Sequence, residues 1–239
     1  MTAILLVHGL SATNKIWDNV LLTLEKKNFR VFNPMLPGHG ISPEHLKNTS
    51  YNDMVAFLKE YTAPIIKQHK KILIIAESFG TNIALDAIPK KYIQAMVCIG
   101  TAVKIRNAFL LSLLANLIKF LRPNYFYKKA EMHPRVKKGT TYDRLHVNTV
   151  AMFFRENWKL KYKLKKCMFP MMFIYSKNDS LIDTEFKKKF LSNHKNDKIE
   201  VIEYDTDTHA ILETKYSKNI TEKIIGFLEM NGKVISMVE

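Results

Sequence analysis

The sequence has few cysteines and no apolar run long enough to cross a membrane. Its only two cysteines, Cys98 and Cys167, lie in or beside apolar runs, which favours buried reduced thiols, and their spacing does not suggest a metal site. The most apolar run, residues 108–118, has about half of the roughly 20 residues that a membrane span needs. We therefore expect a globular protein with no metal and no cofactor.

The N-terminus also lacks the features of a signal peptide. The stretch MTAILLVHGL has no basic residue before its apolar run and no small-residue cleavage site after it. It is predicted to be a strand, which favours a cytoplasmic location.

Acidic residues are scarce in one part of the chain. Residues 101–170 hold 16 Lys and Arg against 3 Asp and Glu, a net charge of +13 out of +15 for the whole chain. Compositional bias is one explanation. The other is a basic surface that contacts an anionic membrane, as a peripheral protein would, or an acidic substrate group.

Strands and helices alternate along most of the 239 residues, which predicts an α/β fold with a mostly parallel sheet of about six strands and helices on both faces. The predicted strands cover 3–7, 29–34, 71–76, 95–100, 171–176 and 198–204. The predicted helices cover about 16–27, 51–67, 82–88, 183–192 and 214–230. The alternation stops at residues 101–165, where no strand is predicted. We therefore expect a core of residues 1–100 and 166–239 with a helical cap, 101–165, inserted in it.

A serine lies on a tight turn between a buried strand and an apolar helix. The sequence there is AESFG, with Ser78 in the middle and Gly80 two residues later. Small residues around such a serine let the backbone turn sharply and display the hydroxyl at the edge of the sheet. The pattern is loose, so a nucleophile is indicated only if partners for Ser78 exist elsewhere.

Both partners are found in the order that this arrangement requires, after later strands. Asp179 follows the strand at 171–176, with Asp183 as a competing acid, and His209 lies in the loop after the last strand. The histidines His8 and His39 also lie at strand ends, but we interpret His8 as shaping its loop. The expected catalytic residues are thus Ser78, His209 and Asp179.

An acyl-transfer site also needs two N–H donors for the negative charge that develops on the substrate oxygen. The backbone N–H of Phe79, which follows the serine, is one candidate. The other is Leu10, directly after His8-Gly9 in the loop that follows the first strand.

The segments LLVHGL and LPGHG, together with Ser78, Asp179 and His209, resemble the α/β-hydrolase superfamily over essentially the whole chain. The similarity is closest to compact bacterial carboxylesterases and monoacylglycerol-lipase-like hydrolases. It implies the α/β-hydrolase fold, a Ser78–His209–Asp179 triad, an oxyanion hole from Leu10 and Phe79, and no cofactor. The chain departs from the family pattern at Ala76, which replaces the first glycine of the turn, and it begins on the strand that other members place second or third.

The cap is the part that should select the substrate. Residues 107–121 form a helix that is apolar around most of its circumference, with one polar strip of Ser112, Asn116 and Lys119. Such a helix either packs on the core or forms a lid wall that contacts an acyl chain or lipid. Aromatic and basic residues alternate around it, at 125–138 and 158–166, which suits an anionic lipid interface and comes without a nucleic-acid-binding motif.

The preferred function is hydrolysis of carboxylic esters through an acyl-enzyme, with a fatty-acyl ester of the monoacylglycerol or lysophospholipid type as substrate. Thioesterase and acyltransferase activities use the same triad and remain alternatives. A non-catalytic protein of this fold that binds lipid or a partner through its basic cap is a further alternative, which the complete triad disfavours. No nucleic acid partner is expected, and the sequence does not indicate an oligomeric state.

Overall fold

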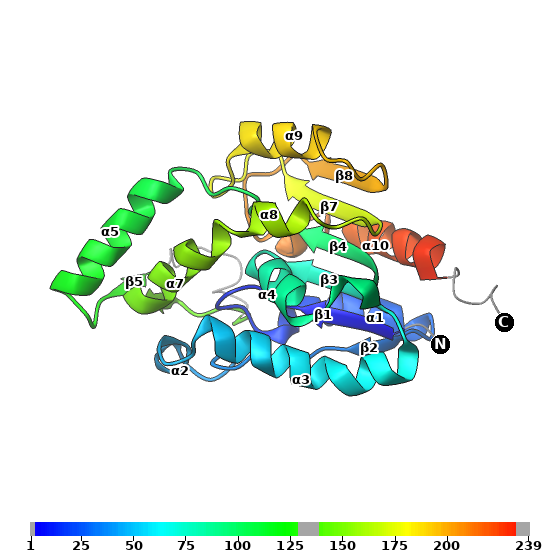
Figure 1. Ribbon diagram of the computed structural model, residues 1–239, viewed down its shortest axis with the longest axis horizontal. Coiled ribbons are helices and arrows are strands. Elements are labelled where there is room, and N and C mark those ends of the chain that lie inside the picture. The colour runs from blue at the N-terminus through cyan, green and yellow to red at the C-terminus, as the bar shows by residue number, and fades with distance from the viewer. Residues whose placement is uncertain (1–2, 129–138, 233–239) are drawn as a thin grey trace.

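The computed structural model describes residues 3–128 and 139–232, and six strands within them form one parallel sheet (Figure 1). The strand order is β2-β1-β3-β4-β7-β8. The strands are β1 (Ala3–Val7), β2 (Arg30–Phe32), β3 (Ile72–Glu77), β4 (Ile93–Ile99), β7 (Met171–Ser176) and β8 (Ile199–Tyr204). The predicted sheet is confirmed. Because all its strands are parallel, their carboxyl ends lie along one edge, where loops from different strands can build a site.

The central strands are apolar over their full length because helices cover both of their faces. Every residue of β1, β3 and β7 is buried, whereas the edge strands β2 and β8 are partly exposed. On one face the core is completed by α3 (Tyr51–His69), α4 (Phe79–Ala87) and α9 (Thr184–Ser192). On the other face it is completed by α1 (Asp18–Lys26) and α10 (Ser217–Gly232).

The remaining connections are short, and the helix limits differ from the predicted ones by a few residues. A short helix α2 (Pro43–Lys47) and three 3₁₀ turns, Asn14–Trp17, Lys90–Tyr92 and Ile211–Glu213, lie between the main elements. The largest differences are of three residues: α10 begins three residues later than predicted, and α4 begins at Phe79, three residues earlier. It starts directly after Ser78 because the turn that carries the serine has no further residue between strand and helix.

The segment predicted as the cap contains helices α5 (Ala108–Leu121), α7 (Val147–Asn157) and α8 (Leu160–Leu164). It also contains two strands, β5 (Phe126–Lys128) and β6 (Arg144–His146), which pair antiparallel. No strand was predicted here. Three residues are too few to show the alternation of a strand. Residues 129–138 of the predicted aromatic and basic stretch lie outside the described residues.

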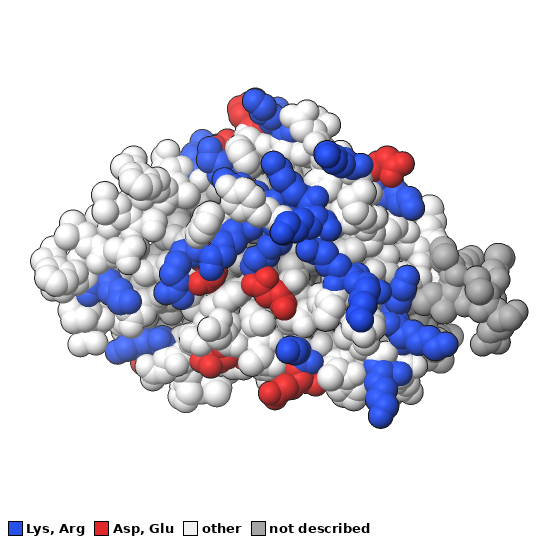
Figure 2. Space-filling view, viewed as in Figure 1, with Lys and Arg blue, Asp and Glu red and all other residues white. Residues whose placement is uncertain are grey.

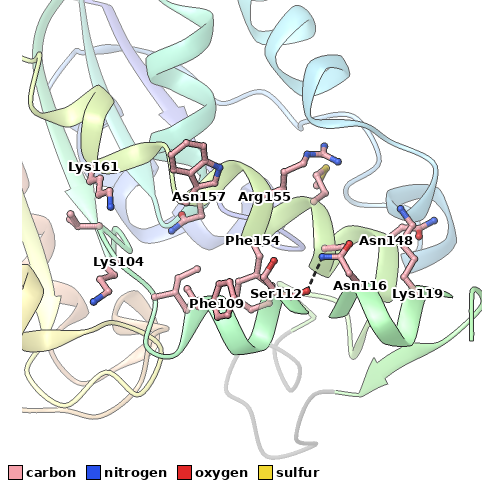
Figure 3. A pocket seen from close by; sticks show the side chains of 16 residues that line it. Lys104, Phe109, Ser112, Asn116, Lys119, Asn148, Phe154, Arg155, Asn157 and Lys161 are labelled. Carbon is pink, nitrogen blue, oxygen red and sulfur yellow. Dashed lines mark hydrogen bonds between the residues drawn. The ribbon is translucent and has the colours of Figure 1, made fainter. Parts of the chain in front are cut away.

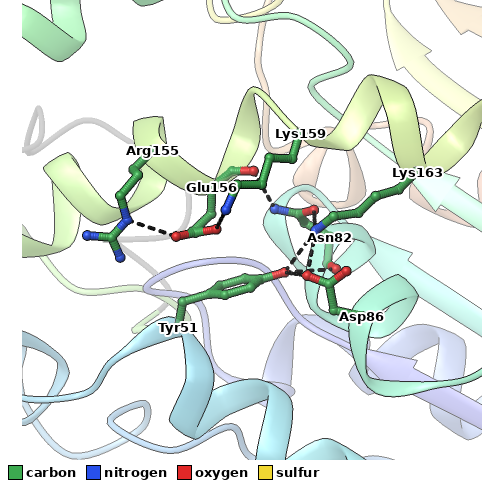
Figure 4. A network of polar contacts seen from close by, with 7 residues as sticks. All are labelled: Tyr51, Asn82, Asp86, Arg155, Glu156, Lys159 and Lys163. Atoms are coloured by element: carbon green, nitrogen blue, oxygen red, sulfur yellow. Dashed lines mark hydrogen bonds and ion pairs between the residues drawn. The ribbon is translucent and has the colours of Figure 1, made fainter.

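Helices α7 and α8 are anchored to the core by a polar network (Figure 4). Lys163 of α8 donates to Asn82 of α4 at 2.7 Å and forms an ion pair with Asp86 at 2.5 Å. Tyr51 of α3 donates to the same Asp86 carboxylate at 2.7 Å, and the side chain of Asn82 donates to the carbonyl of Glu156 at 3.1 Å. These contacts tie this part of the segment predicted as the cap to the helix that follows Ser78.

Helix α5 is different, because its apolar face is exposed. It lies at the end of the molecule farthest from α10 and contacts α7 rather than the sheet (Figure 1). Phe109 is 80% exposed and Phe120 is 83% exposed, and only Ala115 of this helix is buried. The polar strip of Ser112, Asn116 and Lys119 faces α7 across a groove. Packing of the apolar face on the core, one of the two interpretations of the sequence, is therefore wrong.

None of the helices in the described ranges is both long enough and apolar enough to cross a membrane. Nor do three or more potential metal ligands come together among the residues 3–128 and 139–232.

Candidate active site

Ser78 lies at the carboxyl end of β3, on a backbone turn that few residues adopt. Its φ is 50° and its ψ is −119°, a strained conformation for a residue with a side chain. The N–H of Ser78 donates to the carbonyl of Ile99 at the end of the neighbouring strand, at 2.8 Å, which helps to hold the turn. Strain of this kind is typical of a serine whose hydroxyl is displayed at the top of a sheet.

The small residues near Ser78 are required by the packing around the turn. A Cβ at Gly80 would lie 2.5 Å from the carbonyl oxygen of Val7 and 2.6 Å from that of His8, so only glycine fits there. Ala76 is fully buried in β3, level with Val7 and Cys98 of the two neighbouring strands. This position accommodates a methyl group, which explains why alanine can replace the glycine of the family pattern.

The structure brings Ser78, His209 and Asp179 together, although they are up to 131 residues apart in sequence. The Nε2 atom of His209 lies 2.8 Å from the Oγ atom of Ser78, and its Nδ1 atom lies 2.7 Å from Oδ2 of Asp179. Asp179 comes from the loop after β7 and His209 from the loop after β8. A hydroxyl, an imidazole and a carboxylate in such a series can activate the hydroxyl as a nucleophile.

The environment keeps Asp179 ionised. Burial by itself would raise the pKa of this carboxyl, whose side chain is only 2% exposed. The hydrogen bond and the charge interaction with His209 outweigh burial, together with bonds from the N–H groups of Leu181 and Ile182, so the pKa lies below its ordinary value. The carboxylate therefore remains charged at neutral pH and can orient the imidazole.

The competing acid, Asp183, has a different place in the structure. Its Oδ1 accepts the N–H of Phe186 at 3.0 Å and so caps the beginning of α9, and its Oδ2 lies 3.0 Å from Nζ of Lys104. These two contacts hold its pKa below the ordinary value. Asp179, and not Asp183, makes the contact with His209.

Leu10 lies in a loop that two buried side chains support. The N–H of Gly9 donates to Oε2 of Glu77 at 2.9 Å, and the N–H of Ser11 donates to Nε2 of His39 at 3.0 Å. A Cβ at Gly9 would lie 2.2 Å from the same Glu77 oxygen, so a side chain there would displace the Glu77 carboxylate. Sequence reasoning missed Glu77, because a carboxylate beside the serine has no recognisable pattern.

The two histidines at the strand ends have structural partners. Nε2 of His8 accepts the N–H of Leu36 at 3.1 Å, and its ring lies edge-on to that of His39. His8 therefore shapes its loop, as interpreted from the sequence.

Phe79 is the first residue of α4, and the first N–H groups of a helix have no partner within the helix. Its N–H is thus a donor at the positive end of the helix dipole.

A model of the hydrolase family described as serine aminopeptidase, S33, matches residues 1–215. The chain belongs to this family. No protein with a curated description matches the sequence.

Solved structures with similar folds include several lipolytic enzymes. The structure reported for the metagenome-derived lipolytic enzymes LipS and LipT has a TM-score of 0.79 at 14% identity, and the match covers 96% of this chain and 94% of that one. For a monoacylglycerol lipase from Paleococcus ferrophilus the TM-score is 0.75 at 15% identity, with coverage of 96% and 94%. For a soluble variant of monoglyceride lipase from Saccharomyces cerevisiae, in complex with a substrate analogue, it is 0.79 at 16% identity, with coverage of 96% and 87%.

At these identities the structures establish the fold, which is that of the α/β-hydrolases. The resemblance to esterases and monoacylglycerol-lipase-like hydrolases that the motifs predicted is confirmed. Family and fold together identify the chain as a hydrolytic enzyme.

Proposed function

We propose that this protein hydrolyses carboxylic esters through an acyl-enzyme on Ser78. The observation that carries the proposal is the unbroken series of hydrogen bonds from Ser78 through His209 to Asp179, at 2.8 and 2.7 Å. The family and the lipolytic enzymes of similar fold support an ester as the substrate.

In the first half of the reaction Oγ of Ser78 attacks the ester carbonyl, and Nε2 of His209 takes the hydroxyl proton. The N–H groups of Leu10 and Phe79 bind the oxygen on which negative charge develops. The intermediate then collapses, the bond to the alcohol breaks, and His209 returns the proton to the leaving alcohol. Asp179 holds the imidazole in position and stabilises its charged form.

In the second half a water molecule attacks the acyl carbon while His209 takes one of its protons. The bond to Oγ of Ser78 breaks, the serine recovers its proton from His209, and the carboxylic acid leaves and loses its proton to the solvent. His209 thus carries each proton transfer up to the release of the acid.

We infer a fatty-acyl chain in the substrate, because the cap carries an unusual amount of apolar surface and several enzymes of similar fold are lipases. The test is kcat/KM for a series of p-nitrophenyl esters from C2 to C16. An optimum above the shortest chains is expected. A maximum at C2 would contradict the fatty-acyl substrate, and no turnover of any ester would contradict ester hydrolysis.

Two further substrates in the same experiment distinguish ester hydrolysis from thioesterase and peptidase activity. Acyl-CoA of the preferred chain length tests a thioesterase, and an amino-acid p-nitroanilide tests the peptidase activity named by the family. Oxygen esters are expected to be the better substrates in both comparisons.

We also propose that the cap contacts anionic membranes, with α5 as the element that enters the lipid. Large exposed apolar side chains cover the outer face of α5, a feature that marks interaction surfaces. In Figure 2 a band of Lys and Arg crosses the middle of one face, over α8, while the end formed by α5 is largely uncharged. An apolar end beside a basic band suits a bilayer with anionic head groups.

Co-sedimentation with vesicles tests this contact. Binding is expected to be stronger to phosphatidylglycerol than to phosphatidylcholine vesicles. The double variant Leu113→Gln/Leu117→Gln is expected to weaken it at least about tenfold, since each buried leucine contributes about 1.5–3 kcal/mol. Leu22→Gln, which changes an exposed leucine of α1, is the matched control. Equal binding by the double variant and the control would contradict a role for α5.

A further inference from the structure

The groove between α5 and α7 has the composition of a binding site, and the proposed reaction does not use it. It has a volume of about 540 Å³, within the range of roughly 300–1,000 Å³ that is usual for small-molecule sites. Its walls come from the segment after β4, from α5, from α7 and from the beginning of α8 (Figure 3). Ser78, His209 and Asp179 are not among its lining residues.

The lining carries positive charge without any acidic residue. Lys104, Lys119, Arg155 and Lys161 line the groove, and no Asp or Glu does. Figure 3 shows Lys104 and Lys161 toward one end of the groove and Arg155 and Lys119 toward the other. A site of this kind favours an anionic group.

Two of these cations are paired with carboxylates outside the groove, and two are not. Lys104 lies 3.0 Å from Asp183, and Nε of Arg155 lies 2.8 Å from Glu156. Among the described residues, Lys119 and Lys161 have no carboxylate within ion-pair distance. An anionic ligand would therefore be attracted most strongly by these two ammonium groups.

Between the charged ends the groove is both apolar and able to donate hydrogen bonds. Phe109, Phe154 and Trp158 supply aromatic surface, and Ser112 and Asn116 add polar groups from the polar strip of α5. Asn116 and Lys119 of the polar strip are exposed, so their polar groups are open to a ligand in the groove. A ligand with an anionic head and an apolar chain would use both parts of the lining.

A series of ring contacts connects the residue next to the nucleophile with the groove. The ring of Phe79, next to Ser78, packs against Phe153 with centroids 5.3 Å apart, and Phe153 packs against Phe154 of the groove at 5.5 Å. On the other side, the N–H of Arg106 donates to the carbonyl of Leu181 at 2.9 Å, which joins the groove wall to the loop of Asp179. The site lies beside the catalytic residues without including them.

We propose that this groove binds a single-chain lipid with an anionic head group, namely a fatty-acid anion with its carboxylate. This rests on the proposed function in one respect only: hydrolysis of a fatty-acyl ester releases such an anion next to the groove. The chain lies along Phe109, Phe154 and Trp158, and the head pairs with the lysines at either end. A lipid phosphate presents the same chemistry, and the experiment distinguishes the two heads.

Isothermal titration calorimetry on the Ser78→Ala protein tests the site without turnover, with dodecanoate, dodecyl phosphate and the neutral dodecanol as probes. One saturable site for dodecanoate is expected, with at least about tenfold weaker binding of dodecanol, a difference of about 1.4 kcal/mol. Tighter binding of dodecyl phosphate would support the anionic site and assign a phosphate head. Non-saturable uptake, or dodecanol bound as tightly as dodecanoate, would overturn the proposal.

The double variant Lys119→Glu/Lys161→Glu is expected to bind dodecanoate at least about tenfold more weakly. The matched control is Lys218→Glu, an exposed lysine on α10, which should change the affinity less than twofold. An equal loss in both variants would show unspecific attraction and contradict the site. Ester hydrolysis by the unaltered protein is measured separately, so that dodecanoate binding with no esterase activity would refute the proposed function and leave the groove proposal standing.

Discussion

Replacing Ser78 by alanine is expected to lower kcat/KM for a p-nitrophenyl ester by about 10⁴-fold or more. Without the Oγ atom no acyl-enzyme can form, and only the N–H donors and substrate binding are left to assist attack by water. The same change is expected to abolish covalent labelling by a fluorophosphonate, which reacts with activated serines. Both results are measured on one preparation, by steady-state kinetics and by mass spectrometry of the labelled peptide.

A second serine variant controls for effects on folding. Ser192, in α9, has an exposed side chain that donates only to the carbonyl of Lys189, so Ser192→Ala should keep both labelling and activity. Thermal unfolding of Ser78→Ala should resemble that of the unaltered protein, since the described contact of its Oγ atom is the one with His209. Labelling or ester hydrolysis that survives in Ser78→Ala would show that Ser78 is not the nucleophile.

The positions of the candidate site residues could be predicted from the sequence because each of them lies shortly after a predicted strand. Ser78, Asp179 and His209 each follow a continuous apolar run, and parallel strands bring their carboxyl ends to one edge whatever the loops between them do. The same reasoning favoured Asp179 but left Asp183 as a competing acid. That choice depends on which of two carboxylates in one loop turns toward the imidazole, a matter of a few backbone dihedrals.

The orientation of α5 could not be predicted from the periodicity of its apolar and polar residues. An apolar helix with one polar strip indicates two faces, but not which of them meets the rest of the protein. Here Ser112, Asn116 and Lys119 face the groove, and the leucines face outward. The support of the Leu10 loop by Glu77 was also unpredictable, because it joins residues 68 positions apart through one hydrogen bond.

Changing Asp179 to asparagine is expected to lower kcat by about 10³- to 10⁴-fold with little change in KM. Asp179 accepts from Nδ1 of His209, which fixes the tautomer that leaves Nε2 free to take the proton of Ser78. Asparagine has nearly the same shape but can present an N–H to the ring, so it favours the wrong tautomer and removes the charge that stabilises the imidazolium. Substrate binding does not involve this carboxylate, which is 2% exposed, and KM should therefore be nearly unaffected.

The matched control is the same chemical change four residues along the chain. Asparagine caps a helix about as well as aspartate, so Asp183→Asn should keep the beginning of α9 and lose only the ion pair with the half-exposed Lys104. Exposed pairs of this kind contribute about 0–1 kcal/mol. Asp183→Asn is therefore expected to change kcat less than threefold. A comparable loss of kcat in both variants, or a larger one in Asp183→Asn, would mean that Asp179 does not orient His209, and the proposed division of roles between the two carboxylates would have to be abandoned.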